Sequence, residues 1–245
     1  LILVFVSAIW WLPTVWLLAV AEAVLLLGFV EYARMADALG ARVPRVVSAS
    51  AAMATSAAVG LGLPLEAVLA AALVAAGAVL VGSRTPGPTV LAEAAATLFP
   101  VLYLGVPIGS LVALHLTAGR EAVLWLLVTV VVSDTAQYFT GRLLGRHRLS
   151  PIISPKKTVE GAAGGFVLTP AVMAVVGRWW LPALPAGWTA ALALLIVALG
   201  IAGDLFESLL KRSAGIKDSS ALIPGHGGVL DRIDALLFAA PAFLV

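Results

Sequence analysis

Long apolar runs alternate with short polar or Pro/Gly-containing breaks along the 245-residue chain. A helix that crosses a bilayer needs about 20 largely apolar residues. Nine runs are candidates, and the two at the ends are short. They cover residues 1–12, 14–31, 44–61, 65–82, 94–117, 121–140, 161–180, 187–204 and 233–245. The pattern predicts an all-α, polytopic integral membrane protein with about nine transmembrane helices in one domain, residues 1–245.

Composition supports a membrane protein, because 62% of the residues are hydrophobic and only 11% are charged. Soluble domains contain about 25% charged residues. The chain has no Cys, which excludes a disulfide framework and a thiolate metal site. The formal net charge of +2 gives no reason to expect a nucleic-acid partner. Since the chain begins without Met and stops inside an apolar run, we expect both termini to be truncated.

The basic residues are distributed unevenly between the two sides of the predicted bundle. If the first run starts inside, 13 of the 15 Lys and Arg residues fall in inside loops. They are Arg34, Arg42, Arg45, Arg84, Arg142, Arg146, Arg148, Lys156, Lys157, Lys211, Arg212, Lys217 and Arg232. Only Arg120 and Arg178 remain outside. This bias predicts that the 141–160 loop and the 205–232 stretch lie together on the cytoplasmic side.

Two acidic residues of the second run have local interpretations. Glu22 lies inside the run, where a carboxylate is costly and is often functional. It is either a proton or ion site, or a group near the outer interface that pairs with a neighbouring helix. Glu31 and Arg34 are three residues apart at the end of the run, and this spacing predicts a local ion pair.

The most polar stretch is Ser208–Asp234, which holds eight charged or titratable residues within 27. It follows an apolar run that ends in Asp204 and Glu207. If this run continues as a helix, both carboxylates share a face with Ser208 and Lys211. Such a face suits a hard cation such as Mg²⁺, which takes oxygen ligands. The glycines of residues 224–228 let a backbone approach a ligand closely. We therefore predict the active site here.

A second polar cluster follows the sixth run. Asp134 lies near its cytoplasmic end, where it is a functional carboxylate or an interhelical hydrogen-bond partner. Residues 154–161 predict a Pro-stiffened turn with Lys156 and Lys157, followed by a helix start at Gly161. Such a turn presents cations and backbone N–H groups to phosphate. The chain has no Walker A sequence. The residues indicate a metal-dependent enzyme that acts on a phosphate-bearing substrate at the inner membrane face.

The Ser208–Asp234 stretch, called the signature segment below, resembles the signature of the CDP-diacylglycerol synthase (phosphatidate cytidylyltransferase) family. That signature fixes a dozen positions, and all of them are met. They are Ser208, Lys211, Arg212, Lys217, Asp218, Pro224, His226, Gly227, Gly228, Asp231, Arg232 and Asp234. Residues 133–135, 154–158 and 203–205 also resemble the family. The likeness covers most of residues 94–245, which would be the catalytic helices, whereas residues 1–93 match only in character. Ala136 and Gln137 replace a Gly-Ala pair found in many members, which puts local helix packing in doubt.

The resemblance implies the reaction CTP + phosphatidate → CDP-diacylglycerol + diphosphate, with Mg²⁺ and room for a second cation such as K⁺. It also implies a homodimer in the cytoplasmic (inner) membrane of a bacterium, with the active site facing the cytoplasm. Two alternatives stay open. One is a related enzyme that uses another lipid phosphate or a polyprenol. The other is a transporter with an ion path along Glu22, Asp134 and Asp204, although most of the carboxylates gather at one face rather than at the midplane.

With this reaction as the expectation, we hypothesise roles for the residues of the two polar clusters. Asp204 and Asp231 are the first metal-ligand candidates, with Asp134, Glu207, Asp218 and Asp234 as weaker ones. The catalytic set is Asp204, Asp231, Lys211, Arg212 and Lys217. The substrate-binding set is Ser154, Lys156, Lys157, Thr158, Ser208, His226, Gly227, Gly228 and Arg232.

Overall fold

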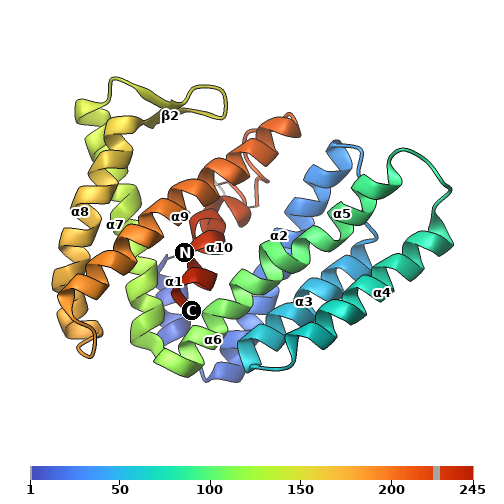
Figure 1. The fold of residues 1–245 in the computed structure, drawn as a ribbon, viewed down its shortest axis with the longest axis horizontal. Coiled ribbons are helices and arrows are strands. Elements are labelled where there is room, and N and C mark those ends of the chain that lie inside the picture. The colour runs from blue at the N-terminus through green and yellow to red at the C-terminus, as the bar shows by residue number, and fades with distance from the viewer. Residues whose placement is uncertain (1, 223–226, 245) are drawn as a thin grey trace.

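The computed structural model describes residues 2–222 and 227–244, and the chain is almost entirely helical (Figure 1). The helices are α1 (Ile2–Trp11), α2 (Thr14–Ala38), α3 (Arg45–Leu61), α4 (Leu65–Ser83), α5 (Val90–Pro100), α6 (Val106–Ala118), α7 (Arg120–Leu144), α8 (Val159–Trp180), α9 (Ala186–Ser213) and α10 (Leu230–Leu244). A π-helical turn, Val101–Gly105, joins α5 to α6. Two short strands are β1 (Arg148–Ser150) and β2 (Ser154–Thr158).

Helical structure covers each predicted apolar run. Six stretches in the described part of the chain are long and apolar enough to cross a membrane. These are α2, α4, the continuous stretch Val90–Ala118, α7, α8 and α9. The helix α3 is apolar but has 17 residues, whereas α1 has 10 and α10 has 15. The chain is therefore a multi-pass membrane protein, and the count of nine spans stays a prediction.

The polar segment between α7 and α8 corrects the all-α prediction. Its strands β1 and β2 pair antiparallel, with Arg148 opposite Thr158. The residue before a proline is driven towards extended backbone, which favours a strand at Ser154. The Thr158 side chain then accepts the N–H of Gly161 and caps α8, which begins at Val159 rather than at Gly161. The predicted turn is thus a β-hairpin that leads directly into a helix.

The helix α10 joins two apolar clusters. One cluster surrounds Phe29, Leu104 and Leu230, and it brings together α2, the π-helical turn and α10. The other surrounds Trp125 and Met173 and includes the later residues of α10. In Figure 1, α7, α8 and α9 form one group of helices and α2 to α6 form another. Because α10 packs against both α9 and α6, it fixes the two groups relative to each other.

Two helices extend well beyond their apolar runs, to the same end of the bundle. The helix α2 continues to Ala38 and α9 to Ser213, instead of ending near residues 31 and 204. The hairpin lies at this end too, since Lys157 of β2 forms an ion pair of 2.5 Å with Asp204 of α9. The prediction that the 141–160 and 205–232 stretches lie together is confirmed, and that this end faces the cytoplasm stays a prediction.

Candidate active site

The polar face of α9 matches the predicted spacing. The Ser208 hydroxyl donates to Asp204 Oδ1 at 3.3 Å, and Lys211 Nζ donates to Glu207 Oε2 at 2.6 Å. Both pairs are four residues apart, so the helix itself brings them together. Glu207 is fully buried and Lys211 nearly so. A buried carboxylate requires such a partner, because an isolated buried charge is costly.

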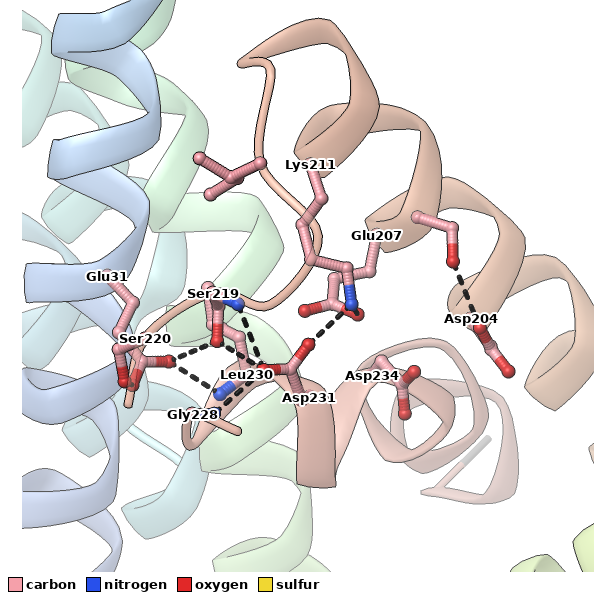
Figure 2. Close-up of polar contacts among 12 residues, drawn as sticks. Glu31, Asp204, Glu207, Lys211, Ser219, Ser220, Gly228, Leu230, Asp231 and Asp234 are labelled. Atoms are coloured by element: carbon pink, nitrogen blue, oxygen red, sulfur yellow. Dashed lines mark hydrogen bonds and ion pairs between the residues drawn. The ribbon is translucent and has the colours of Figure 1, made fainter. Parts of the chain in front are cut away.

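Asp231, in the first turn of α10, accepts donors on both oxygens (Figure 2). Its Oδ1 forms an ion pair with Lys211. Its Oδ2 accepts the Gly228 N–H at 2.7 Å, the Ser219 N–H at 3.0 Å and the Ser219 hydroxyl at 2.8 Å. Burial alone raises the pKa of Asp231, but donation from Lys211, Gly228 and Ser219 outweighs it and lowers the pKa to about 2. Asp231 is therefore ionised and organises the loop before α10.

Glu31 of α2 completes this arrangement, and the prediction for it was wrong. Instead of pairing with Arg34, its side chain points into the protein and is 2% exposed. It accepts hydrogen bonds from the hydroxyls of Ser219 and Ser220 and from the N–H groups of Val229 and Leu230. The local spacing of Glu31 and Arg34 concealed this role. The available signal in the sequence was the helical spacing of Gly28, Glu31 and Met35, which puts them on one face. In the structure this face is buried.

The two described glycines of the 224–228 turn have distinct reasons to be glycine. Gly227 has φ +78°, a conformation that side chains disfavour. At Gly228 a Cβ atom would lie 2.6 Å from Glu31 Cδ and would also collide with the Ser219 hydroxyl. The loop backbone therefore packs directly on the Glu31 carboxylate. The predicted substrate-binding residue His226 lies outside the described residues, as does Pro224.

A pocket of about 480 Å³ lies between the hairpin and the helices α7, α8 and α9. Polar residues from both predicted clusters line it, among them Asp134, Arg142, Lys156, Lys157 and Asp204. The Lys157–Asp204 ion pair spans the pocket wall, and its side chains are 21% and 32% exposed. Asp134 thus lines a pocket. No hydrogen bond from its side chain to a neighbouring helix is found within residues 2–222 and 227–244.

The remaining predicted residues lie around this centre. Arg212 donates to the Ile216 carbonyl at 3.0 Å and so binds the chain that follows α9. Lys217, Asp218 and Arg232 are exposed at the same end. Ser154 begins β2, and Thr158, besides capping α8, lines the pocket. Sequence reasoning thus gathered a group of residues that does meet in space, but it left out Glu31, Ser219 and Ser220.

Glu22 of α2 stays apart from this centre. Its carboxylate oxygens are buried and have no hydrogen-bond partner within the described chain. The hydroxyl of Ser56, in α3, is in the same condition. Neither interpretation of Glu22 is tested by this geometry.

Comparison with known proteins now decides the family. A family model described as "Cytidylyltransferase family" matches residues 1–245. The chain belongs to the cytidylyltransferase family. Relatives named phosphatidate cytidylyltransferase include one from Helicobacter pylori (strain ATCC 700392 / 26695), 41% identical over 73% of this chain and 64% of the relative. Another, from Staphylococcus saprophyticus, is 38% identical over 61% of this chain and 57% of the relative. A third, from Haemophilus influenzae, is 42% identical over 51% of this chain and 45% of the relative.

The alignments with these relatives agree with the family but span only part of each relative. The chain matches less than two thirds of the length of each of these three proteins. The suspected resemblance to phosphatidate cytidylyltransferases is confirmed at the level of the family.

The carboxylates of this family member have the chemistry that a hard cation requires. Asp134 of α7 and Asp204 of α9 line the same pocket, and Asp234 belongs to α10, where its backbone packs against Gly203 of α9. Carboxylate oxygens are the ligands that Mg²⁺ takes in proteins, and Mg²⁺ usually keeps several waters and binds through one or two carboxylates. In the described part of the chain, no three His, Cys, Asp or Glu side chains converge closely enough to chelate a metal directly. A site with two carboxylates, waters and substrate phosphate fits these residues.

Proposed function

We propose that the protein is a phosphatidate cytidylyltransferase, which converts CTP and phosphatidate to CDP-diacylglycerol and diphosphate. One observation carries the proposal: the Lys157–Asp204 ion pair joins the lysine-bearing strand β2 to the carboxylate face of α9 at the wall of one pocket. Cations that attract phosphate and carboxylates that attract Mg²⁺ therefore border the same space. The names of the relatives support this choice among cytidylyl transfers.

The chemistry requires charge neutralisation and positioning more than proton transfer. A phosphate oxygen of phosphatidate, already anionic at neutral pH, forms a bond to the α-phosphorus of CTP. The bond from that phosphorus to the bridging oxygen breaks, and its electron pair leaves with diphosphate. Because nucleophile and leaving group are both anionic, catalysis of phosphoryl transfer rests mainly on cations and alignment.

Residues around the pocket supply these cations. Lys156, Lys157 and Arg142 line it and would bind phosphate groups of the nucleotide or lipid. Lys211 is held between Glu207 and Asp231, so we assign it an organising role. Exposed Lys217 and Arg232 at the same end would add positive charge around the nucleotide.

Asp204 and Asp234 are the residues that we propose to hold Mg²⁺. Both carboxylates belong to neighbouring helices in Figure 2, and neither is enclosed by donors as Asp231 is. Mg²⁺ would neutralise charge on the triphosphate and favour departure of diphosphate. Asp231, our first partner for Asp204 on sequence grounds, would have to give up a donor to join them. A second cation such as K⁺ remains part of the proposal.

Membrane topology completes the proposal. The Lys and Arg bias supports a site that faces the cytoplasm in a bacterial inner membrane. Phosphatidate would then enter from the bilayer with its acyl chains remaining among the helices. We also expect a homodimer, to be tested by the mass of the protein in detergent.

The decisive experiment measures diphosphate release by the purified protein with phosphatidate, CTP and Mg²⁺. Reactions lacking lipid or treated with EDTA are run in parallel. The variant Asp204→Asn tests the pocket, and Asp37→Asn is its matched control. Asp37 also forms a single ion pair, with Arg45 at 2.8 Å, but it lies in the exposed last turn of α2.

We expect release that requires lipid and metal, is lost in Asp204→Asn and persists in Asp37→Asn. Release without lipid would indicate a nucleotide hydrolase instead. Absence of turnover from folded protein in lipid would reject the proposed reaction.

A further inference from the structure

We propose that Glu31 is a positioning residue for the cytidylyl transfer proposed above. It fixes both ends of the 219–230 loop on α2, so that Asp231 remains paired with Lys211. This inference rests on the proposed function for its kinetic consequence. Its structural consequence can be measured without it.

Each oxygen of the Glu31 carboxylate accepts one hydroxyl and one backbone N–H. Oε1 accepts Ser220 Oγ at 2.6 Å and Val229 N at 2.9 Å. Oε2 accepts Ser219 Oγ at 2.9 Å and Leu230 N at 2.8 Å. Hydrogen bonds to an ionised acceptor are about twice as strong as neutral ones. One side chain therefore holds the loop where it leaves α9 and where it enters α10.

The part of α2 that carries Glu31 is closely packed. It lies on a face of α2 that packs into the apolar cluster around Phe29 and Leu230. The next residue, Tyr32, donates its hydroxyl to the Ala96 carbonyl at 2.8 Å and ties α2 to α5. The Gly228 backbone then rests directly on the carboxylate. This packing fixes the backbone of α2 at Glu31, so that the carboxylate is presented to the loop.

Ser219 links Glu31 to the centre of the site. Its hydroxyl lies 2.9 Å from Glu31 Oε2 and 2.8 Å from Asp231 Oδ2. The two carboxylate oxygens share its single proton, so this hydroxyl contacts both side chains at once. From Asp231 the contacts continue to Lys211 and Glu207 of α9. A connected polar path thus runs from α2 through the loop and α10 to α9 (Figure 2).

A carboxylate is required at this position, and an amide of the same size is not equivalent. In Glu31→Gln, one acceptor oxygen becomes an NH₂ group, which only donates. Whichever way the amide turns, this group faces the N–H of Val229 or of Leu230, which also only donates. A serine hydroxyl can rotate to adapt, but a backbone N–H cannot. The substitution therefore removes one end of the anchor while it preserves volume.

The test compares Glu31→Gln with Glu31→Asp, which keeps both acceptor oxygens on a shorter stem. Glu93→Gln is the matched control, because Glu93 is also a buried carboxylate of the N-terminal helices but pairs with Arg84, away from the loop. Ser220→Ala is a milder variant that removes one donor to Glu31. The readouts are kcat and KM for CTP, thermal unfolding, and amide hydrogen exchange of residues 219–222 and 227–230.

We expect Glu31→Gln to lower kcat about tenfold or more, because small displacements of reacting groups are costly in rate. Exchange in the loop should rise while that of α7 and α8 stays unchanged. Glu31→Asp should recover part of the rate, Ser220→Ala should lose about twofold to threefold, and Glu93→Gln should keep wild-type kcat in its folded fraction.

Two results would overturn the inference: loop exchange that is unchanged in Glu31→Gln and Ser220→Ala, or a rate loss in Glu31→Gln no larger than in Glu93→Gln at equal folded fraction. If Glu31→Gln does not fold, Ser220→Ala decides the matter. If the wild type shows no transfer, the proposed function fails, and the exchange comparison still decides the anchoring.

Discussion

Asp231 and Asp204 lie at the same end of the bundle but in opposite surroundings. Asp231 is 8% exposed and accepts donors from a lysine, a hydroxyl and two backbone N–H groups. Asp204 is 32% exposed, pairs with Lys157 across a pocket and accepts a 3.3 Å hydrogen bond from Ser208. The first carboxylate is enclosed by protein, whereas the second faces space that a ligand can fill.

This difference separates two roles that the sequence does not distinguish: holding the site together and binding a ligand. A buried, fully bonded charge specifies one arrangement of its neighbours and is costly to break. A partly exposed ion pair is weak, so a substrate or cation can displace one partner at little cost. We therefore assign Asp231 to holding the site together and Asp204 to contact with ligands. The following variants test this division.

Asp231→Asn should have the largest effect on stability. It removes the charge that balances Lys211 and places an NH₂ group among donors. Breaking a buried ion pair typically costs 3–5 kcal/mol, and we expect a loss of about 3 kcal/mol of unfolding free energy here. Thermal or denaturant unfolding in detergent would measure it. An unchanged midpoint would show that Asp231 is not an organising residue.

Gly228→Ala should come next, because a methyl group has no room against Glu31 and Ser219. Overpacking of this kind costs about 1–3 kcal/mol. Gly77→Ala is the control, since a Cβ at Gly77 meets no atom within 4 Å and Ala favours the helix. Comparable unfolding midpoints for the two variants would contradict close packing of the loop on Glu31.

Lys157→Gln should leave stability almost unchanged and reduce activity. Partly exposed ion pairs contribute about 0–1 kcal/mol, so the unfolding free energy should change by less than that. Loss of a charge that meets phosphate should lower kcat/KM by about a hundredfold. Arg178→Gln, an exposed cation near the far end of α8, is the control for activity. Equal kcat/KM for both variants would show that Lys157 does not bind a substrate phosphate.

Glu160→Gln should have the smallest effect. Glu160 accepts the N–H groups of Arg146 and His147 at 3.0 and 3.2 Å and pairs with the His147 ring at 2.6 Å. The His147 side chain is 78% exposed and that of Glu160 is 25% exposed, so we expect this partly exposed pair to lose under about 1 kcal/mol. Hydrogen exchange of β1 and β2 should rise locally. A global loss of stability would show that the hairpin contributes more to the fold than its exposure indicates.

The sequence predicts the helices well because apolar runs of membrane length leave few alternatives. It places their ends less well. The helix α9 continues to Ser213. Asp204 and Lys211 form hydrogen bonds with polar residues four positions away on the same helix face, so this part of the helix does not depend on apolar neighbours. The hairpin of β1 and β2 was not predicted, because two strands this short carry no hydrophobic alternation.

The site was predictable where its residues are close in sequence. The spacing of Asp204, Glu207 and Lys211 fixes their common face. Glu31 could not be found in this way, because its partners follow it by 188 to 199 positions. Local spacing pointed to Arg34 instead. The contact depends on how α2 packs beside α10, which no short pattern contains.

The long sequence separation between Glu31 and its partners has a consequence for biosynthesis. Glu31 is translated 198 residues before Val229 and 199 residues before Leu230, so these partners can reach it only after all the intervening helices have been made. Contacts between such distant positions carry a large loop-closure entropy and form late. Until then the acidic end of α2 must stay hydrated at the membrane surface. We therefore expect the hydrogen bonds between Glu31 and the ends of the 219–230 loop to be among the last to form, after the helices have inserted.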